Sequence, residues 1–115
     1  MIAILLATAL MTSPAAAPAL GSLECNVGSV IEPIGGHDWI VHGCADGKSV
    51  VVVAGPPNPA AFFYFIVMPQ GDGIILHGEG DGDKSATQAA YEQLKEFSAN
   101  DLELLYKRAV ASNAP

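Results

Sequence analysis

Residues 25–44, CNVGSVIEPIGGHDWIVHGC, begin and end with the only two cysteines of the chain. Two apolar segments in this stretch are separated by the turn-forming residues IGG, a pattern typical of a β-hairpin. If Ile34 and Gly35 form the tip, Cys25 lies directly opposite Cys44. Opposed residues of an antiparallel pair have Cα atoms about 4.5–5.5 Å apart, which is within disulfide range. We therefore predict a hairpin whose two arms are joined by a Cys25–Cys44 disulfide.

A zinc site is the alternative interpretation of the same stretch. Cys25, His37, His42 and Cys44 are of the residue types that bind zinc, but their spacing matches neither a CxxC nor an HxxxH pattern. An even pair of cysteines favours the disulfide if the chain is exported, as its apolar N-terminal run indicates. Free thiols are the third alternative.

Short apolar runs alternate with turn residues in the middle of the chain. Asp46 and Gly47 stand between two such runs, which is one of the strongest short signals for a hairpin, and this turn places Val41 near Val52. Three prolines in residues 54–61 predict an ordered surface loop, and residues 68–72 predict a longer hairpin loop. We expect strands at about residues 22–32, 38–44, 48–54, 62–67 and 73–79, with the first two as a hairpin.

Two of these segments, residues 50–53 and 62–67, show no alternation of apolar and polar residues. Strands of this kind are covered on both faces. One cover lies in residues 85–112, which carry the only helical periodicity. Its apolar positions are Ala90, Leu94, Phe97, Leu102, Leu105, Tyr106 and Ala109. Ser98 followed by Asp101 predicts a new helix start, so we expect helices at about residues 86–97 and 99–111. The second face of the sheet then needs a partner or remains exposed.

The predicted fold class is α+β: a four-stranded antiparallel β-meander followed by one or two C-terminal helices packed on one face, preceded by a signal peptide. Residues 2–11 form an uncharged apolar run that precedes a stretch of small residues broken by Pro14. A membrane-spanning helix needs roughly 20 apolar residues, so this run is too short for an anchor. Ala17 and Ala19 fit cleavage before Leu20. We therefore expect a signal peptide at 1–19, a single domain at 20–115, and a periplasmic or secreted protein without a stable membrane anchor.

The charge of the chain limits its partners. Twelve acidic residues face only five lysines and arginines, which gives a net charge of −7. Such a chain repels phosphate backbones and anionic lipid surfaces. We therefore expect a protein partner or a homodimer, and no nucleic acid.

Acidic residues gather in residues 77–92, HGEGDGDKSATQAAYE. They are Glu79, Asp81, Asp83 and Glu92. Counted from Asp81, a calcium loop of the EF-hand type needs glycine at its sixth position, where Ala86 stands. The other interpretation is a strand exit and a helix start, with Ser85 as the N-cap and Gln88 as its partner in a capping box. We favour the helix start and keep weak calcium binding through residues 79–92 as the alternative.

His37, His42 and His77 are the candidate catalytic or metal-binding histidines. A general base needs a nucleophile or an acid within about 3 Å, which sequence spacing does not show. The sequence contains no GxSxG, HExxH, Walker or Rossmann pattern. We therefore assign no catalytic, cofactor-binding or metal-binding residue. The expected function is a non-enzymatic binding module that uses an apolar sheet surface; a small enzyme using His42 or His77 with a nearby acid is a further alternative.

Overall fold

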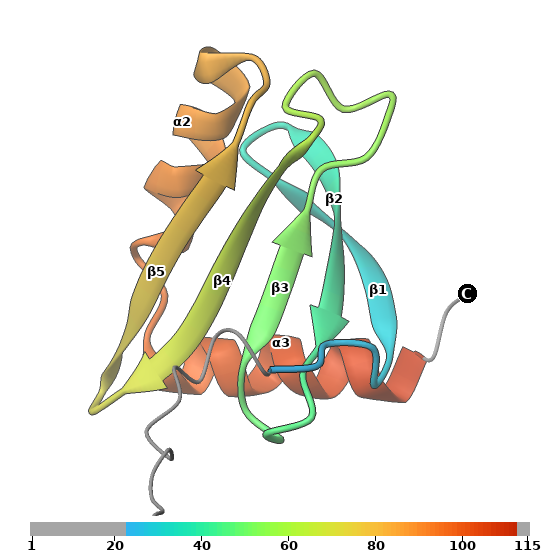
Figure 1. The fold of residues 1–115 in the computed structure, drawn as a ribbon. Coiled ribbons are helices and arrows are strands. Elements are labelled where there is room, and N and C mark those ends of the chain that lie inside the picture. The colour runs from blue at the N-terminus through green and yellow to red at the C-terminus, as the bar shows by residue number, and fades with distance from the viewer. Residues whose placement is uncertain (1–22, 113–115) are drawn as a thin grey trace, which may run out of the picture.

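The computed structural model describes residues 23–112 and contains a five-stranded antiparallel sheet with two helices packed on one face (Figure 1). The strands are β1 (Ser29–Ile34), β2 (His37–Gly43), β3 (Val50–Val53), β4 (Phe63–Gln70) and β5 (Gly73–Gly80), and the helices are α2 (Lys84–Leu94) and α3 (Ala99–Ser112). The strands lie in chain order, which confirms the predicted α+β meander. The count of four strands was one too low, because each of the predicted segments forms its own strand. The predicted signal peptide, residues 1–19, lies outside the described residues.

The first hairpin turns at Gly35 and Gly36, one residue later than predicted. Ile34 pairs with His37 across this turn. Both glycines have positive φ, 62° and 91°, which is the backbone conformation that the tightest hairpin turns require and that glycine adopts without a steric penalty. The Gly-Gly pair therefore sets the register of β1 and β2.

The predicted disulfide between Cys25 and Cys44 is present, although the register of the hairpin differs from the predicted one. Val27 donates its backbone N–H to the Gly43 carbonyl at 3.1 Å, and Gly43 donates its own N–H to the Gly28 carbonyl at 2.9 Å. Two consecutive residues thus share one partner, as in a β-bulge, and this shift moves Cys25 toward Cys44. Because both sulfurs are bonded to each other, the alternative zinc site is wrong.

The other two hairpins differ in how well the sequence predicts them. The Asp46–Gly47 turn pairs Val41 with Val52, as predicted. The last hairpin turns tightly between Gln70 and Gly73, so the predicted long loop at residues 68–72 is wrong and Pro69 lies inside β4. In a two-residue hairpin the flanking residues bond to each other and the bonding alternates from there, so the nitrogen of Pro69 faces away from β5. It points to the side of β3, whose pairing with β4 ends at Val67, so no ladder hydrogen bond is lost.

Helix α2 begins earlier than predicted, because its N-cap is Asp83 and not Ser85. The Asp83 carboxylate accepts hydrogen bonds from the backbone N–H groups of Ser85 at 2.8 Å and Ala86 at 3.1 Å. Gln88 does not complete the predicted capping box and instead donates to Glu92 at 2.6 Å.

Helix α3 begins at the predicted cap. Ser98 donates its backbone N–H to the Asp101 carboxylate, and Asp101 donates its N–H to the Ser98 hydroxyl, both at 3.0 Å. The predicted pair of Glu103 and Lys107, one turn apart, is also present at 3.2 Å. A second helix therefore starts where the sequence predicts it.

The hydrophobic core lies between the sheet and the helices. Trp39 is fully buried at its centre, with its ring centroid 5.6 Å from that of Phe65 and its indole N–H donating to the Ile34 carbonyl at 3.0 Å. The helix positions predicted from periodicity supply the other wall. Those that are buried are Ala90, Leu94, Leu102, Leu105 and Ala109.

Gly35 also allows α2 to approach the sheet, which gives a first testable prediction. A Cβ atom at Gly35 would meet the backbone of Ala89 and Ala90 at 2.6–2.9 Å, whereas one at Gly36 would meet nothing within 4 Å. Gly36→Ala is expected to cost about 1–2 kcal/mol for the left-handed backbone alone. Gly35→Ala adds the overlap with the helix, for a total loss of about 3 kcal/mol. Urea unfolding of both variants measures the difference, and equal losses would show that α2 does not depend on this approach.

Candidate functional site

The face of the sheet opposite the helices is the main candidate site. Residues that pair across antiparallel strands point to the same face, so the register determines which side chains share it. One row runs from Ile31 through Ile40 and Val53 to Tyr64, and the next from His42 through Val51 and Ile66 to His77. We call the apolar members of this face the apolar patch. They are Ile31, Ile40, Val51, Val53, Ile66, Met68 and Ile75.

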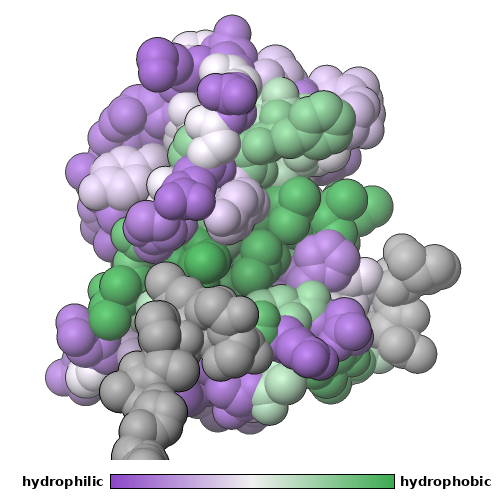
Figure 2. All heavy atoms as spheres, in the orientation of Figure 1, coloured by the Kyte–Doolittle hydropathy of each residue, from purple (hydrophilic) through white to green (hydrophobic). Residues whose placement is uncertain are grey.

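The apolar patch is open to solvent in the described part of the chain. Ile31 is 63% exposed and Ile75 is 39% exposed, and the other members are half-buried by one another. Figure 2 shows a band of hydrophobic residues across the middle of this face, with hydrophilic residues above and below it. Because strands lie about 4.8 Å apart, a patch that reaches from β1 to β5 is about 20 Å wide.

Polar side chains on β4 and β5 form one border of the apolar patch. The Tyr64 hydroxyl donates to the Glu79 carboxylate at 2.9 Å, and His77 Nε2 lies 3.5 Å from the other oxygen of Glu79. The hydrogen bond from Tyr64, and then that from His77, lower the pKa of Glu79 from its usual value. The same hydrogen bond and the negative charge of Glu79 raise the pKa of Tyr64. Glu79 is therefore an ionised acceptor at neutral pH.

The three candidate histidines lie apart from one another. His37 begins β2 at the hairpin turn, His42 lies near the other end of β2, and His77 lies on β5. His42 and His77 stand in the same row, three strand spacings apart, which is about 14 Å. The pair of His77 and Glu79 is surface-exposed, with 48% and 60% of the side chains accessible. The fold thus places one histidine beside an acid but does not bring the histidines together.

The acidic residues of the 79–92 stretch are likewise dispersed. Glu79 faces the apolar patch, Asp83 caps α2, and Glu92 pairs with Lys95 at 2.7 Å. Hydrogen bonds from Ser85 and Ala86 lower the pKa of Asp83, so it stays charged as a cap. Within residues 23–112 no group of three or more histidines, cysteines and acids is placed to hold a metal ion.

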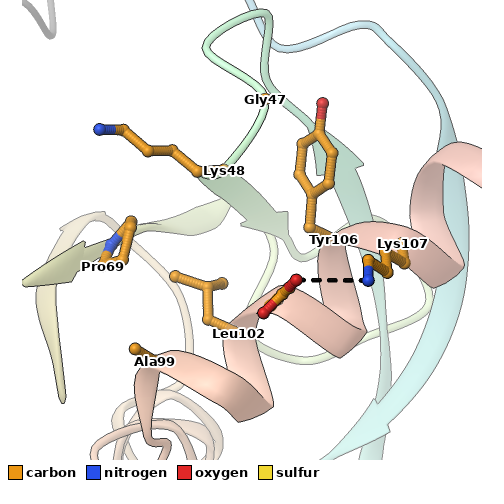
Figure 3. A pocket seen from close by; sticks show the side chains of 8 residues that line it. Gly47, Lys48, Pro69, Ala99, Leu102, Tyr106 and Lys107 are labelled. Atoms are coloured by element: carbon orange, nitrogen blue, oxygen red, sulfur yellow. Dashed lines mark ion pairs between the residues drawn. The ribbon is translucent and has the colours of Figure 1, made fainter. Parts of the chain in front are cut away.

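A pocket of about 370 Å³ lies between α3, the β2–β3 turn and the end of β4 (Figure 3). Its lining residues are Gly47, Lys48, Pro69, Ala99, Leu102, Glu103, Tyr106 and Lys107. The Lys107 ammonium pairs with Glu103 at 3.2 Å, and the Tyr106 hydroxyl donates to the Cys44 carbonyl at 3.0 Å. These polar groups already have partners within the protein, so among the lining side chains only Lys48 is left to bind an anion. We therefore regard the apolar patch as the better candidate.

No protein-family model, curated protein or solved structure matches this chain. None of the helices in the described part of the chain is both long and apolar enough to cross a membrane.

The sequence predicts an uncovered sheet face, but it does not identify all the residues that form this face. The absence of polar alternation in residues 50–53 and 62–67 points to Val51, Val53 and Ile66. Ile31 and Ile75 were missed, because a strand with a mixed pattern shows its outer face only when the register is known. The Gly-Gly turn supplies that register for Ile31, and a correct choice of tip would have identified it.

Proposed function

We propose that this protein is an exported, non-enzymatic binding module that holds another protein against the apolar patch. The observation that carries the proposal is the patch itself: seven apolar side chains on the uncovered face of a sheet, in the described part of the chain. Contiguous exposed apolar surface rimmed by polar residues is typical of protein interaction sites.

The shape and charge of the site favour a protein over other ligands. Small molecules bind in concave pockets that enclose most of their surface, whereas the apolar patch lies on an extended sheet face. The net charge of −7 repels nucleic acids and anionic lipids. Protein interfaces combine an apolar centre with a polar rim, which is the arrangement found here.

The rim indicates the chemistry of the partner. Within residues 23–112, Asp38 and Glu79 are the only acidic residues whose β-strand positions place them on this face, and they lie at its borders. No lysine or arginine occupies a strand position on the same face in the described residues. The expected partner therefore presents an apolar centre with basic side chains near its edge, because complementary charges favour the correct encounter.

Two observations support export. The disulfide Cys25–Cys44 is of the kind that persists in oxidising compartments, and the first nineteen residues have the composition of a signal peptide. In a periplasmic or secreted location the expected mature chain begins at Leu20.

Site-specific crosslinking in the native host tests the proposal. A photoreactive amino acid at Ile31 or Val51 is expected to crosslink one recurring protein, whereas the same group at Leu104, which is 48% exposed on α3, is not. With that protein purified, the double substitution Ile31→Asp and Val51→Asp is expected to weaken binding at least about tenfold, because a charge is buried without a partner. Leu104→Asp should leave binding unchanged.

Equal crosslinking at Leu104, or binding that tolerates both aspartates, would show that the apolar patch is not the binding surface. Mass spectrometry of the same material reads its N-terminus. A retained Met1, or two reduced cysteines, would contradict export.

A further inference from the structure

The two edges of the sheet are not equally protected. An edge strand exposes unpaired backbone N–H and C=O groups that can pair with another strand, and proteins block such edges with proline, charges or covering segments. β1 and β5 are the edge strands here. The sequence of β1 contains a proline, SVIEPI, while that of β5, GIILHGEG, contains neither proline nor lysine.

The register shows which backbone groups face outward at each edge. Gly28 and Gly43 are bonded through their backbones, and bonding alternates from there, so the groups of Ile31 and Pro33 point away from β2. Pro33 thus removes a donor from the outer side of β1 and costs that strand nothing in its own pairing.

On β5 the same alternation starts from the pair of Gln70 and Gly73 beside the tight turn. The backbone groups of Ile74, Leu76 and Gly78 therefore point outward. No described residue forms a hydrogen bond with these outward groups. Figure 1 shows β5 as the outermost strand at its side of the sheet. This edge lacks the protection that β1 has.

We propose that β5 pairs in antiparallel orientation with β5 of a second copy of this chain, about a two-fold axis at Leu76. In this register Leu76 faces its own equivalent, and Ile74 of each copy faces Gly78 of the other. All outward groups of the three residues are then paired. The two sheets become one continuous sheet, with the helices of both copies on one side and both apolar patches on the other.

The surface beside Gly78 favours a second copy and this register. The rings of Phe63 and Phe65 lie against Gly78 on the helix side of the sheet. A hollow of about 240 Å³ opens beside them, lined by Phe63, Phe65, Gly78, Thr87, Gln88 and Tyr91. Ile74 points to the same side of the sheet as Gly78, since both pair with residues that face the helices. In the proposed pair, Ile74 of one copy stands beside the hollow of the other, and the symmetry repeats this contact.

Charge is compatible with self-pairing, although each copy carries a net charge of −7. Glu79 is the only charged acid on β5, and it lies opposite Gly73 of the second copy in this register. Its carboxylate is held by Tyr64 and His77 of its own chain. Ile75 lies opposite His77, so no two like charges face each other across the new pair.

Sedimentation of proline variants tests the proposal on the disulfide-bonded protein. The wild type is expected to have twice the mass of one chain. Ile74→Pro removes an outward donor and leaves the β4–β5 ladder intact, so this variant is expected to be monomeric. Ile31→Pro removes an outward donor from β1 and is the matched control, which is expected to remain dimeric. Any of three results would overturn the proposal. The wild type could stay monomeric at millimolar concentration, the Ile74→Pro variant could be dimeric, or the dimer could be lost in Ile31→Pro alone.

Cysteine crosslinking tests the register. Leu76→Cys places two sulfurs across the axis, where Cα atoms are about 5.5 Å apart and a disulfide forms on oxidation. Ile74→Cys places them about 14 Å apart, because each Ile74 lies two positions, about 6.6 Å, from the axis along its own strand and the two offsets run in opposite directions. Only Leu76→Cys is therefore expected to give a covalent dimer; the reverse result, or equal yields, would overturn the register.

Hydrogen exchange of the wild type provides a readout that needs no folded variant. The amides of Ile74, Leu76 and Gly78 are expected to be protected at high protein concentration and to lose protection on dilution. Fast exchange of all three at every concentration would overturn the proposal. The aspartate substitutions that test the apolar patch lie on β1 and β3, so either proposal can fail while the other stands.

Discussion

Trp39→Ala is expected to lower the free energy of unfolding by about 3–5 kcal/mol, the typical cost of removing a large aromatic side chain from a core. Trp39 is fully buried, lies against Phe65 and donates a hydrogen bond to Ile34. Its loss therefore leaves a cavity between the sheet and both helices. Domains of this size have a total stability of about 5–15 kcal/mol, so the variant is expected to be only marginally folded.

Denaturant unfolding followed by far-UV circular dichroism measures this loss, since the substitution removes the only tryptophan and with it the usual fluorescence signal. Phe62→Ala is the matched control, because Phe62 is also aromatic but is 72% exposed. It is expected to change stability by less than about 0.5 kcal/mol. Similar losses for the two variants would mean that Trp39 is not at the centre of the core.

Removal of the disulfide by the double substitution Cys25→Ala and Cys44→Ala is expected to cost about 3 kcal/mol. The bond closes a loop with a sequence separation of 19 residues, and it fixes the segment before β1 to the end of β2. For a domain of this size, each kcal/mol lowers Tm by about 4–8 °C, so the expected decrease is about 12–24 °C.

Calorimetry with and without reductant checks the disulfide prediction. Reductant should lower Tm of the wild type to that of the variant and should leave the variant unchanged. A decrease of only a few degrees would show that the bond contributes little to the constraint of the unfolded chain.

Much of the fold is predictable where a local signal determines it. Asp46 and Gly47 specify the second hairpin and so the pairing of Val41 with Val52. Ser98 and Asp101 specify the start of α3, because each satisfies a backbone N–H of the other. These signals act within a few residues, and tertiary contacts do not compete with them.

Other elements depend on contacts that the sequence does not show. Asp83 and Ser85 are both good caps, and Asp83 is used because its carboxylate reaches two backbone donors. Pro69 argues against a strand until the direction of its nitrogen is known from the pairing of Gln70 with Gly73. The disulfide was predicted correctly from a register that is wrong, since the bulge at Gly28 was not foreseen.

For the candidate site too, the sequence predicts some features, and others depend on contacts that it does not show. Two features indicate that one sheet face is left uncovered: the apolar composition of two strands, and the presence of only two helices in residues 23–112. The residues that form this face can be identified only when the register of the strands is known. The difference between the two sheet edges can be identified only when the direction of individual backbone groups is known. Pro33 is visible in the sequence, but its protective position is not.

The order of the elements along the chain affects how the protein folds. Each strand from β2 onward pairs with the one before it, so the sheet can grow step by step as the chain enters the compartment where it folds, through contacts that are local in sequence. The helices that cover Trp39 and Phe65 come last. Until α3 has emerged, the nascent sheet has apolar residues exposed on both sides, and this is the stage at which the chain is most prone to aggregate and most in need of a chaperone.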